Sequence, residues 1–512
     1  MSGLKRGAAA IVGAAESDLG QVADGLNPID LMAQGIARAA GDAGLKLRDI
    51  DGLLCATTQS RTSGLNLSEY LGISPRFIDT TILGGSSFMF HVAHAVAALQ
   101  LGLCEVAAIA YGSTQRTVGR RQASVREINP FETPYRPFLP STAYALAASR
   151  HMHQFGTKRE QLAEVAVAAR QWALMNPAAW EKKPLTVDEV LNARMVSYPF
   201  TVRDICLVTD GGGAIILTNP ERARSLKKSP VYVLGCGQAI THANISSMPD
   251  LTVTGALSSG KEAYAMAGLS AKDIDVVELY DAFTINTVLF LEDLGFCAKG
   301  EGGSFVSGGR IAPGGSLPVN TNGGGLSYCH PGMYGLFLLI EAVRQLRGEC
   351  GERQVKDARR RSRTAMAASS PHKAPLFSAP PLRFNAAVAA PFVIIGIDRV
   401  GNIARRLVEP IVAAASFVEI AADRVATSFV GGVNGAEIES HRRNHSGTVH
   451  RVGIITEIDL ARVRCHSPDD KPLLHPRALV HPQERVRGAM SSIRQIEKMR
   501  MRRRVVVRPI PG

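Results

Sequence analysis

The chain has 512 residues, 46% of them hydrophobic and 20% charged, which is typical of a globular protein with room for two or three domains. No segment approaches the roughly 20 consecutive apolar residues of a membrane-spanning helix, so no membrane span is expected. Residues 1–350 hold 30 Lys and Arg against 31 Asp and Glu, so the positive excess behind the net charge of +13 lies in residues 351–512. The main fold is therefore not expected to bind nucleic acid.

The cysteines and histidines are scattered. The eight cysteines form no C-x-x-C pair, which favours a reducing compartment and hence the cytoplasm. His441, His445 and His450 lie close together but among arginines, so a solvated segment is favoured over a metal site. We expect no bound metal.

Residues 1–358 alternate short β-branched runs with helical patterns, the signature of an α/β protein with parallel strands. The helical patterns are apolar on most faces, which predicts deep packing. The expected strands are 8–14, 51–57 and 105–112, and the expected helices are Pro28–Gly41 and Phe88–Leu101.

An internal repeat divides this region. AGLKLRDIDGLLC at 43–55 recurs as AGLSAKDIDVVEL at 267–279, with Ala-Gly-Leu and Asp-Ile-Asp at the same spacing. Upstream, AAIVG is echoed by VYVLG, and downstream AVAALQLG is echoed by AVRQLRG. Three echoes in one order predict two equivalent halves, 1–229 and 230–358.

A long insertion, about 113–199, separates the third expected strand from the second half. It holds a loop rich in Arg and Pro, followed by a helix that we expect to begin with a capping box of Thr157 and Glu160. Ordered insertions of this length are commonly lids or binding loops.

Four motifs carry a resemblance to a known family. They are FGTKREQLAEVAVAARQWALMNP, VLNARMVSYPFTVRDICLVTDGGGAIILT, ELYDAFTINTVLFLEDLGFCAKGEGGSFV and LPVNTNGGGLSYCHPGMYGLFLLIEAVRQLRG. With the repeat, they resemble the thiolase superfamily, in the acetyl-CoA acetyltransferase-like branch of sterol carrier protein x and lipid-transfer-type relatives. The resemblance implies two pseudo-symmetric βαβαβ-type halves in α/β/α/β/α layers.

The same resemblance implies substrates and partners. The substrate would be an acyl-CoA thioester, with no permanently bound cofactor. The protein would be a homodimer joined through the sheet edge of the first half. For some relatives it also implies a small partner protein of the OB-fold and zinc-ribbon type.

A family thiolase carries its nucleophilic cysteine at the start of a buried helix, where the helix dipole and backbone donors activate the thiol. In this chain Gly85 takes that position, within LGGSSFMF. Ser86 is a weak candidate nucleophile because no base lies nearby in the sequence, and we favour the interpretation that Ser86 and Ser87 cap the helix. Gly84 is expected to line the substrate.

The second family loop is Tyr280-Asp281-Ala282-Phe283, where the family has Asn-Glu-Ala-Phe or His-Asp-x-Phe. The resemblance places Tyr280 and Asp281 among the catalytic residues, and a tyrosine can donate or accept a proton. The alternative is a buried aromatic side chain with a single hydrogen bond.

The third loop is Cys329-His330-Pro331, which follows three consecutive glycines. A histidine fixed by the following proline suits a general base or an oxyanion donor, so His330 is the main catalytic candidate. Cys329 is a weak candidate nucleophile, and a packed thiol is the alternative. The candidate substrate-binding residues of this loop are Gly323, Gly324, Gly325 and Tyr334, the last of which could share proton transfer.

Residues 359–512 do not continue the family pattern. The repeat requires a buried strand after the helix that ends at Gly348, yet the chain reads DARRRSRTAMAASSPHKAPLFSAPPL. Regrouping the codons of 363–382 by one base permits HGNGGVLSSQSTAILGTAA, a glycine loop and apolar strand of the required kind. We interpret the tail as a frameshift product or disordered segment that leaves the second half incomplete; a genuine basic domain is the alternative.

These features predict a thiolase-like enzyme that acts on acyl-CoA by acyl transfer or by cysteine-independent C–C cleavage of the retro-aldol type in lipid, steroid or fatty-acid metabolism. The second hypothesis is a non-catalytic member that binds acyl-CoA or lipid, or that scaffolds another subunit.

Overall fold

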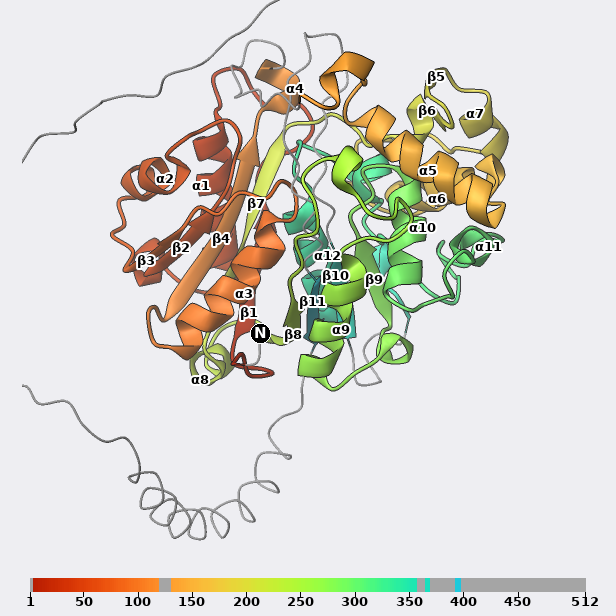
Figure 1. The fold of residues 1–512 in the computed structure, drawn as a ribbon. Coiled ribbons are helices and arrows are strands. Elements are labelled where there is room, and N and C mark those ends of the chain that lie inside the picture. Colours follow the sequence, from red (N-terminus) through yellow and green to blue (C-terminus); the bar gives the residue numbers. More distant parts are fainter. Residues whose placement is uncertain (1–2, 119–129, 357–363, 369–391, 397–512) are drawn as a thin grey trace, which may run out of the picture. The chain divides into compact units, whose positions relative to one another are not determined.

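The computed structural model describes residues 3–118, 130–356, 364–368 and 392–396. Their strands form one nine-stranded sheet, ordered β3-β2-β4-β7-β1-β8-β11-β10-β9, and a separate β5-β6 pair (Figure 1). The strands are β1 Ala10–Glu16, β2 Gly52–Cys55, β3 Phe77–Asp79, β4 Val106–Ser113, β5 Met195–Ser197, β6 Phe200–Thr201, β7 Gly211–Thr218, β8 Val231–Gly237, β9 Val276–Leu279, β10 Thr364–Ala368 and β11 Phe392–Gly396.

Helices cover the sheet and build the insertion. They are α1 Pro28–Ala43, α2 Ser63–Leu71, α3 Ser87–Gln100, α4 Gln115–Val118, α5 Ser141–Phe155, α6 Arg159–Leu174, α7 Val187–Leu191, α8 Pro220–Arg224, α9 Ala256–Ala267, α10 Thr284–Asp293, α11 Gly302–Val306 and α12 Gly335–Arg347. The five expected elements are all present, with ends shifted by at most two residues.

The repeat is a structural repeat. In the first half β2 is parallel to β4, and β7 runs antiparallel to both β4 and β1. In the second half β9 is parallel to β10, and β11 runs antiparallel to both β10 and β8. Gly44 and Gly268 end equivalent helices in the left-handed conformation, with φ of 75° and 63°, and a 3-10 turn and a strand follow each.

The second half extends beyond residue 358, where the sequence pattern predicted an incomplete end. Strand β10, at 364–368, lies where the repeat requires the counterpart of β4, and β11 completes the sheet. The run of arginines argued against a strand here, but the strand begins after that run, at Thr364. Residues 397–512 lie outside the described residues, as do His441, His445 and His450, so the frameshift stays a prediction.

The layers follow from the packing of the helices. Helix α1 packs on β1 and β7, and α9 packs on β8 and β11. Helices α3 and α12 contact each other and strands of both halves, so they form the central layer (Figure 1). This arrangement confirms the predicted layered α/β architecture and brings the starts of α3 and α12 together.

The start of α6 corrects one prediction. Lys158, rather than Thr157, is the N-cap, and its backbone N–H donates to Oε1 of Gln161 at 2.9 Å. The Thr157 hydroxyl instead bonds Nδ1 of His151 at 2.8 Å. The buried histidine competes for the threonine that the sequence assigned to the cap.

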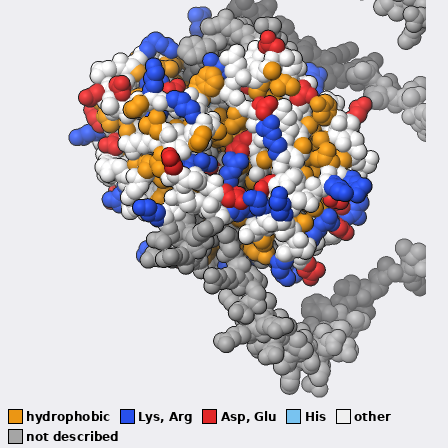
Figure 2. Space-filling model, turned by 180° about the vertical axis from the view of Figure 1, so that it is seen from behind, with side chains coloured by type: hydrophobic (Ala, Val, Ile, Leu, Met, Phe, Trp, Pro, Cys, Tyr) orange, Lys and Arg blue, Asp and Glu red, His pale blue; other side chains and the backbone are white. Residues whose placement is uncertain are grey.

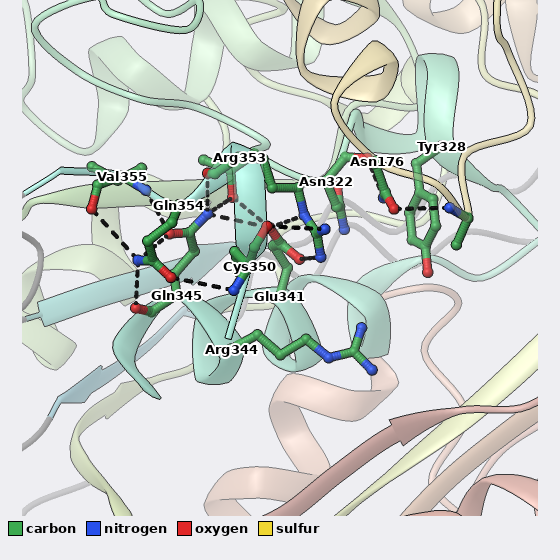
Figure 3. A network of polar contacts seen from close by, with 12 residues as sticks. Asn176, Asn322, Tyr328, Glu341, Arg344, Gln345, Cys350, Arg353, Gln354 and Val355 are labelled. Atoms are coloured by element: carbon green, nitrogen blue, oxygen red, sulfur yellow. Dashed lines mark hydrogen bonds and ion pairs between the residues drawn. The ribbon is translucent and has the colours of Figure 1, made fainter. Parts of the chain in front are cut away.

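A buried ion pair fixes the chain after α12 (Figure 3). Arg353 donates to both carboxylate oxygens of Glu341 at 3.0 Å, and Nε2 of Gln345 donates to the carbonyl of Arg353 at 2.9 Å. The amide of Gln354 bonds the side chain of Gln345 at 2.9 Å. These contacts anchor the segment that leads toward β10.

Charged side chains of both signs are interspersed on the face seen in Figure 2, in keeping with the near balance of charge in residues 1–350. Among the described residues, none of the helices has the length and apolar character needed to cross a membrane.

Candidate active site

Tyr280 occupies the space that a side chain at position 85 would need. A Cβ at Gly85 would lie 2.5 Å from Cζ of Tyr280 and closer still to Cε2 and the hydroxyl oxygen. Tyr280 is fully buried, so its ring has little freedom to give way. Because the Tyr280 ring fills this space, a cysteine side chain at position 85 has no room in this fold.

The two serines beside Gly85 do not behave as predicted. Ser86 is the N-cap residue of α3 but makes no side-chain capping hydrogen bond. The Ser87 hydroxyl donates to the carbonyl of Gly84 at 2.7 Å and accepts from the backbone N–H of Leu83 at 2.8 Å. Ser87 thus stabilises the turn before the helix, with Gly84 in the left-handed region at φ 67°.

The Tyr280 hydroxyl lies at the centre of a small polar cluster. Its oxygen lies 3.1 Å from Nε2 of His330 and accepts a hydrogen bond from the backbone N–H of Tyr334 at 3.1 Å. The carbonyl of Gly332 is a more distant acceptor, at 3.5 Å. Because Nε2 is the nearer acceptor, we infer that Tyr280 donates its proton to His330.

Burial sets the protonation states of this pair. It raises the pKa of Tyr280 well above the ordinary value of 10.0, so the phenol stays protonated at neutral pH. It lowers the pKa of His330 to about 4, so the imidazole is neutral and can accept a proton. The cluster joins a neutral donor to a neutral acceptor.

Asp281 shapes the glycine loop. Its carboxylate accepts from the backbone N–H of Gly325 at 2.6 Å and of Leu326 at 3.4 Å. A Cβ at Gly324, where φ is 64°, would overlap the Asp281 carboxylate, so a glycine is required there. Burial raises the pKa of Asp281 to about 6, and the Gly325 amide opposes that shift. These contacts assign Asp281 a role in shaping the glycine loop.

Glycines 323 and 325 also allow close packing. A Cβ at Gly323 would lie 2.6 Å from Cβ of Ala173 on α6, and one at Gly325 would lie 3.0 Å from Cδ2 of His330. The glycine run therefore brings the loop close to both α6 of the insertion and His330.

Cys329 and Tyr334 are less suited to the roles considered for them. Burial raises the pKa of Cys329 well above the ordinary thiol value, which favours the packed thiol over a nucleophile. The Tyr334 hydroxyl donates to Oδ1 of Asn322 at 2.8 Å, whereas its backbone N–H reaches Tyr280. Its ring stacks on His330, with centroids 6.0 Å apart.

Sequence reasoning missed two residues of this region. Asn322 accepts from Tyr334 and also from the backbone N–H of Gly324, at 2.9 Å. Tyr111 of β4 donates to the carbonyl of Pro331 and accepts from the backbone N–H of Met333 at 3.1 Å. The only sequence signal for Tyr111 is a phenol hydroxyl near the carboxyl end of a mostly apolar strand.

Two histidines, His91 and His94, lie on α3. His91 is buried, whereas His94, whose side chain is 38% exposed, pairs with Asp79 at 2.5 Å. Within the ranges that the structure describes, no group of three or more His, Cys, Asp or Glu side chains could bind a metal ion.

Comparisons with known proteins give the chain its family. The profile of the thiolase C-terminal domain-like family matches residues 237–372, which include Tyr280 and His330. The 17-hydroxy-3-oxo-4-pregnene-20-carboxyl-CoA lyase of Mycobacterium tuberculosis is 33% identical over 366 residues, covering 67% of this chain and 92% of the lyase. Sterol carrier protein 2 of Oryctolagus cuniculus is 33% identical over 45% of this chain and 44% of that protein.

A solved structure agrees with these relatives. The structure of the Ltp2-ChsH2(DUF35) aldolase superposes with a TM-score of 0.66 and 29% sequence identity, covering 77% of this chain and 99% of that chain. The fold, the internal repeat, the loop motifs and the relatives agree: the chain belongs to the thiolase superfamily, in its sterol carrier protein-like branch.

Proposed function

We propose that this protein cleaves a C–C bond of a 3-hydroxyacyl-CoA by a retro-aldol reaction, without a cysteine nucleophile. The observation that carries the proposal is the position of Tyr280. Its ring fills the space of the nucleophile beside Gly85, and its hydroxyl lies 3.1 Å from Nε2 of His330. Acyl transfer through an acyl-cysteine has no side chain at position 85 to use.

The pair can act as a proton relay. The substrate's 3-hydroxyl proton passes to the Tyr280 oxygen while the Tyr280 proton passes to Nε2 of His330. The bond between C2 and C3 breaks, C3 becomes the carbonyl carbon of a released aldehyde or ketone, and the electron pair forms the thioester enolate. The enolate then takes a proton at C2, which returns His330 to its neutral form. Tyr280 never becomes a free phenolate, in keeping with its raised pKa.

Two of the similar proteins carry names that describe such chemistry, and they direct the choice of substrate. One is a lyase of a steroid carboxyl-CoA ester, and the other is an aldolase. A CoA ester with a hydroxylated steroid side chain is therefore the first substrate to test, beside a straight-chain 3-hydroxyacyl-CoA.

A second candidate function is acyl-CoA or lipid binding without turnover. It is favoured by the burial of the pair, since Tyr280 is 0% exposed and His330 is 2% exposed. A substrate reaches them only when neighbouring side chains move.

Turnover of the 3-hydroxyacyl-CoA by site variants tests the proposal. We expect Tyr280→Phe and His330→Gln each to reduce kcat by about 10²- to 10⁴-fold, the usual contribution of a positioned acid or base. Tyr264→Phe is the matched control, because its hydroxyl bonds the carbonyl of Leu294 at 3.1 Å outside this cluster. Wild-type turnover by Tyr280→Phe would refute the relay, and binding without turnover by the wild type would favour the second candidate.

We also propose a homodimer formed through β3. This strand stands at one end of the sheet order, and Leu65, Tyr70, Ile78 and Ile82 around it are 41–66% exposed. Exposed edge strands with apolar side chains favour pairing with a second copy. Light scattering should show a dimer for the wild type and for Met195→Lys, and a monomer for Ile78→Lys; a dimer in all three would place the interface elsewhere.

A small partner protein is the last part of the proposal. The solved aldolase includes a DUF35 component in its name, and we infer a comparable OB-fold and zinc-ribbon partner for this chain. Turnover measured with and without a DUF35-type protein tests this, since equal rates would argue against a functional partner.

A further inference from the structure

The turn between His330 and helix α12 is held by two tyrosine hydroxyls from opposite halves of the molecule. From the second half, the Tyr280 hydroxyl accepts from the backbone N–H of Tyr334 and lies 3.5 Å from the carbonyl of Gly332. From the first half, the Tyr111 hydroxyl donates to the carbonyl of Pro331 and accepts from the backbone N–H of Met333. The two hydroxyls thus serve alternate residues of the same four-residue turn.

We propose that Tyr111 is a positioning residue for the proton relay: by fixing the turn Pro331–Tyr334 from the first half, it sets the distance between the Tyr280 hydroxyl and His330. This inference rests on the proposed function of that pair. Tyr111 lies on β4, and its contact with the turn joins residues 220 positions apart in the sequence.

The turn packs closely against elements of the first half. The φ of Gly332 is 94°, and a Cβ there would overlap Oε1 of Gln115 on α4, so the turn lies directly against the first half. The Tyr111 ring is itself fixed by Phe88 on α3, with centroids 5.2 Å apart. Because these packed contacts are rigid, the positions of β4 and α3 determine the position of the turn.

Loss of the Tyr111 hydroxyl leaves a buried carbonyl and a buried N–H without their partner. Buried backbone groups of this kind shift to find new partners, because an unpaired polar group is costly. The adjacent peptide carries the N–H of Tyr334, so its movement displaces the hydrogen bond to Tyr280. A shift of about 1 Å in such a relay can lower the rate about 10²-fold.

Tyr111→Phe in the full-length chain tests the proposal, with Tyr264→Phe as the control that removes one partly buried tyrosine hydroxyl elsewhere. The first measurement is a long-range ¹H–¹⁵N spectrum of ¹⁵N-histidine-labelled protein, with His330 assigned from the spectrum of His330→Gln. In the wild type and in Tyr264→Phe we expect His330 to stay neutral from pH 5.5 to 8, with its proton on Nδ1. In Tyr111→Phe we expect mixed tautomers and a titration that moves toward pH 6.5.

The second measurement is turnover of the 3-hydroxyacyl-CoA. We expect Tyr111→Phe to lower kcat about 10²-fold with little change in KM, since the hydroxyl positions the relay rather than binding substrate. Should Tyr111→Phe fail to fold, Phe88→Leu loosens the Tyr111 ring while keeping its hydroxyl, and the same spectral change in weaker form is expected.

The two measurements separate the two claims. If the wild type shows no turnover, the proposed function fails, yet the His330 spectrum still tests whether Tyr111 positions the histidine. If Tyr111→Phe leaves the His330 spectrum as it is in Tyr264→Phe, the positioning role is overturned whatever the activity.

Discussion

Adding a single methyl group at Gly85 should destabilise the protein because Tyr280 already fills that space. A Cβ there would lie 2.5 Å from Cζ of the fully buried Tyr280 ring, well inside van der Waals contact. Overpacking of a rigid core costs about 1–3 kcal/mol. Gly41→Ala is the control, since a Cβ at Gly41 in α1 meets no atom within 4 Å and should be neutral or stabilise by about 0.4–1 kcal/mol.

Thermal and urea unfolding of Gly85→Ala, Tyr280→Ala and the double variant completes the experiment. Tyr280→Ala opens a cavity and should cost about 3–5 kcal/mol. Because that cavity accommodates the new methyl group, the double variant should be more stable than the sum of the single changes predicts, by about 1–3 kcal/mol. Equal stability of Gly85→Ala and Gly41→Ala would refute the claim that Tyr280 blocks the position.

Three further predictions address other parts of the structure. Burial, together with the nearby Glu341, raises the pKa of Glu278 well above its ordinary value of 4.5. Above pH 4.5 the folded state therefore keeps a proton that the unfolded state releases. The free energy of unfolding should then fall as pH rises, by up to about 1.4 kcal/mol per pH unit. Glu278→Gln should therefore gain melting temperature relative to the wild type at pH 8 but not at pH 4; an equal difference at both would contradict this. Arg353→Met should destabilise the protein by about 3–5 kcal/mol, because it leaves the Glu341 carboxylate buried and unpaired. Adding Glu341→Gln to the same chain should recover part of that loss, as measured by urea unfolding. No recovery would argue against the pairing. Finally, sequencing the locus across the codons for 355–365 should reveal a shifted frame, whereas an uninterrupted frame shared by independent isolates would exclude it.

Local sequence signals predicted much of the fold. Ala-Gly-Leu followed by Asp-Ile-Asp encodes a left-handed helix end, a 3-10 turn and a strand, and Gly44 and Gly268 adopt this structure in the same way. Strand β10 was missed because its sequence, TAMAA, carries little strand propensity and follows a run of arginines. Its place in the sheet depends on pairing with β9 and β11, which no local pattern reveals.

The candidate site was predictable only as a set of loops. Resemblance located Gly85, Tyr280 and His330, but their mutual packing became visible only in three dimensions, as did the loop-shaping contacts of Asp281. The contact of Tyr111 with the turn after His330 joins residues 220 positions apart, and a single sequence contains no signal for such a pair.

The most direct test of the central claim is the outcome of one reaction. The full-length protein is incubated with a 3-hydroxyacyl-CoA, with and without a DUF35-type partner, and both the small-molecule products and the intact protein mass are measured. Cysteine-independent cleavage predicts an aldehyde or ketone and a shortened acyl-CoA in equal amounts, with no acyl group on the protein and no requirement for free CoA. An acyl adduct on the protein, at Cys329 or elsewhere, or product formation only when free CoA is added, would contradict it.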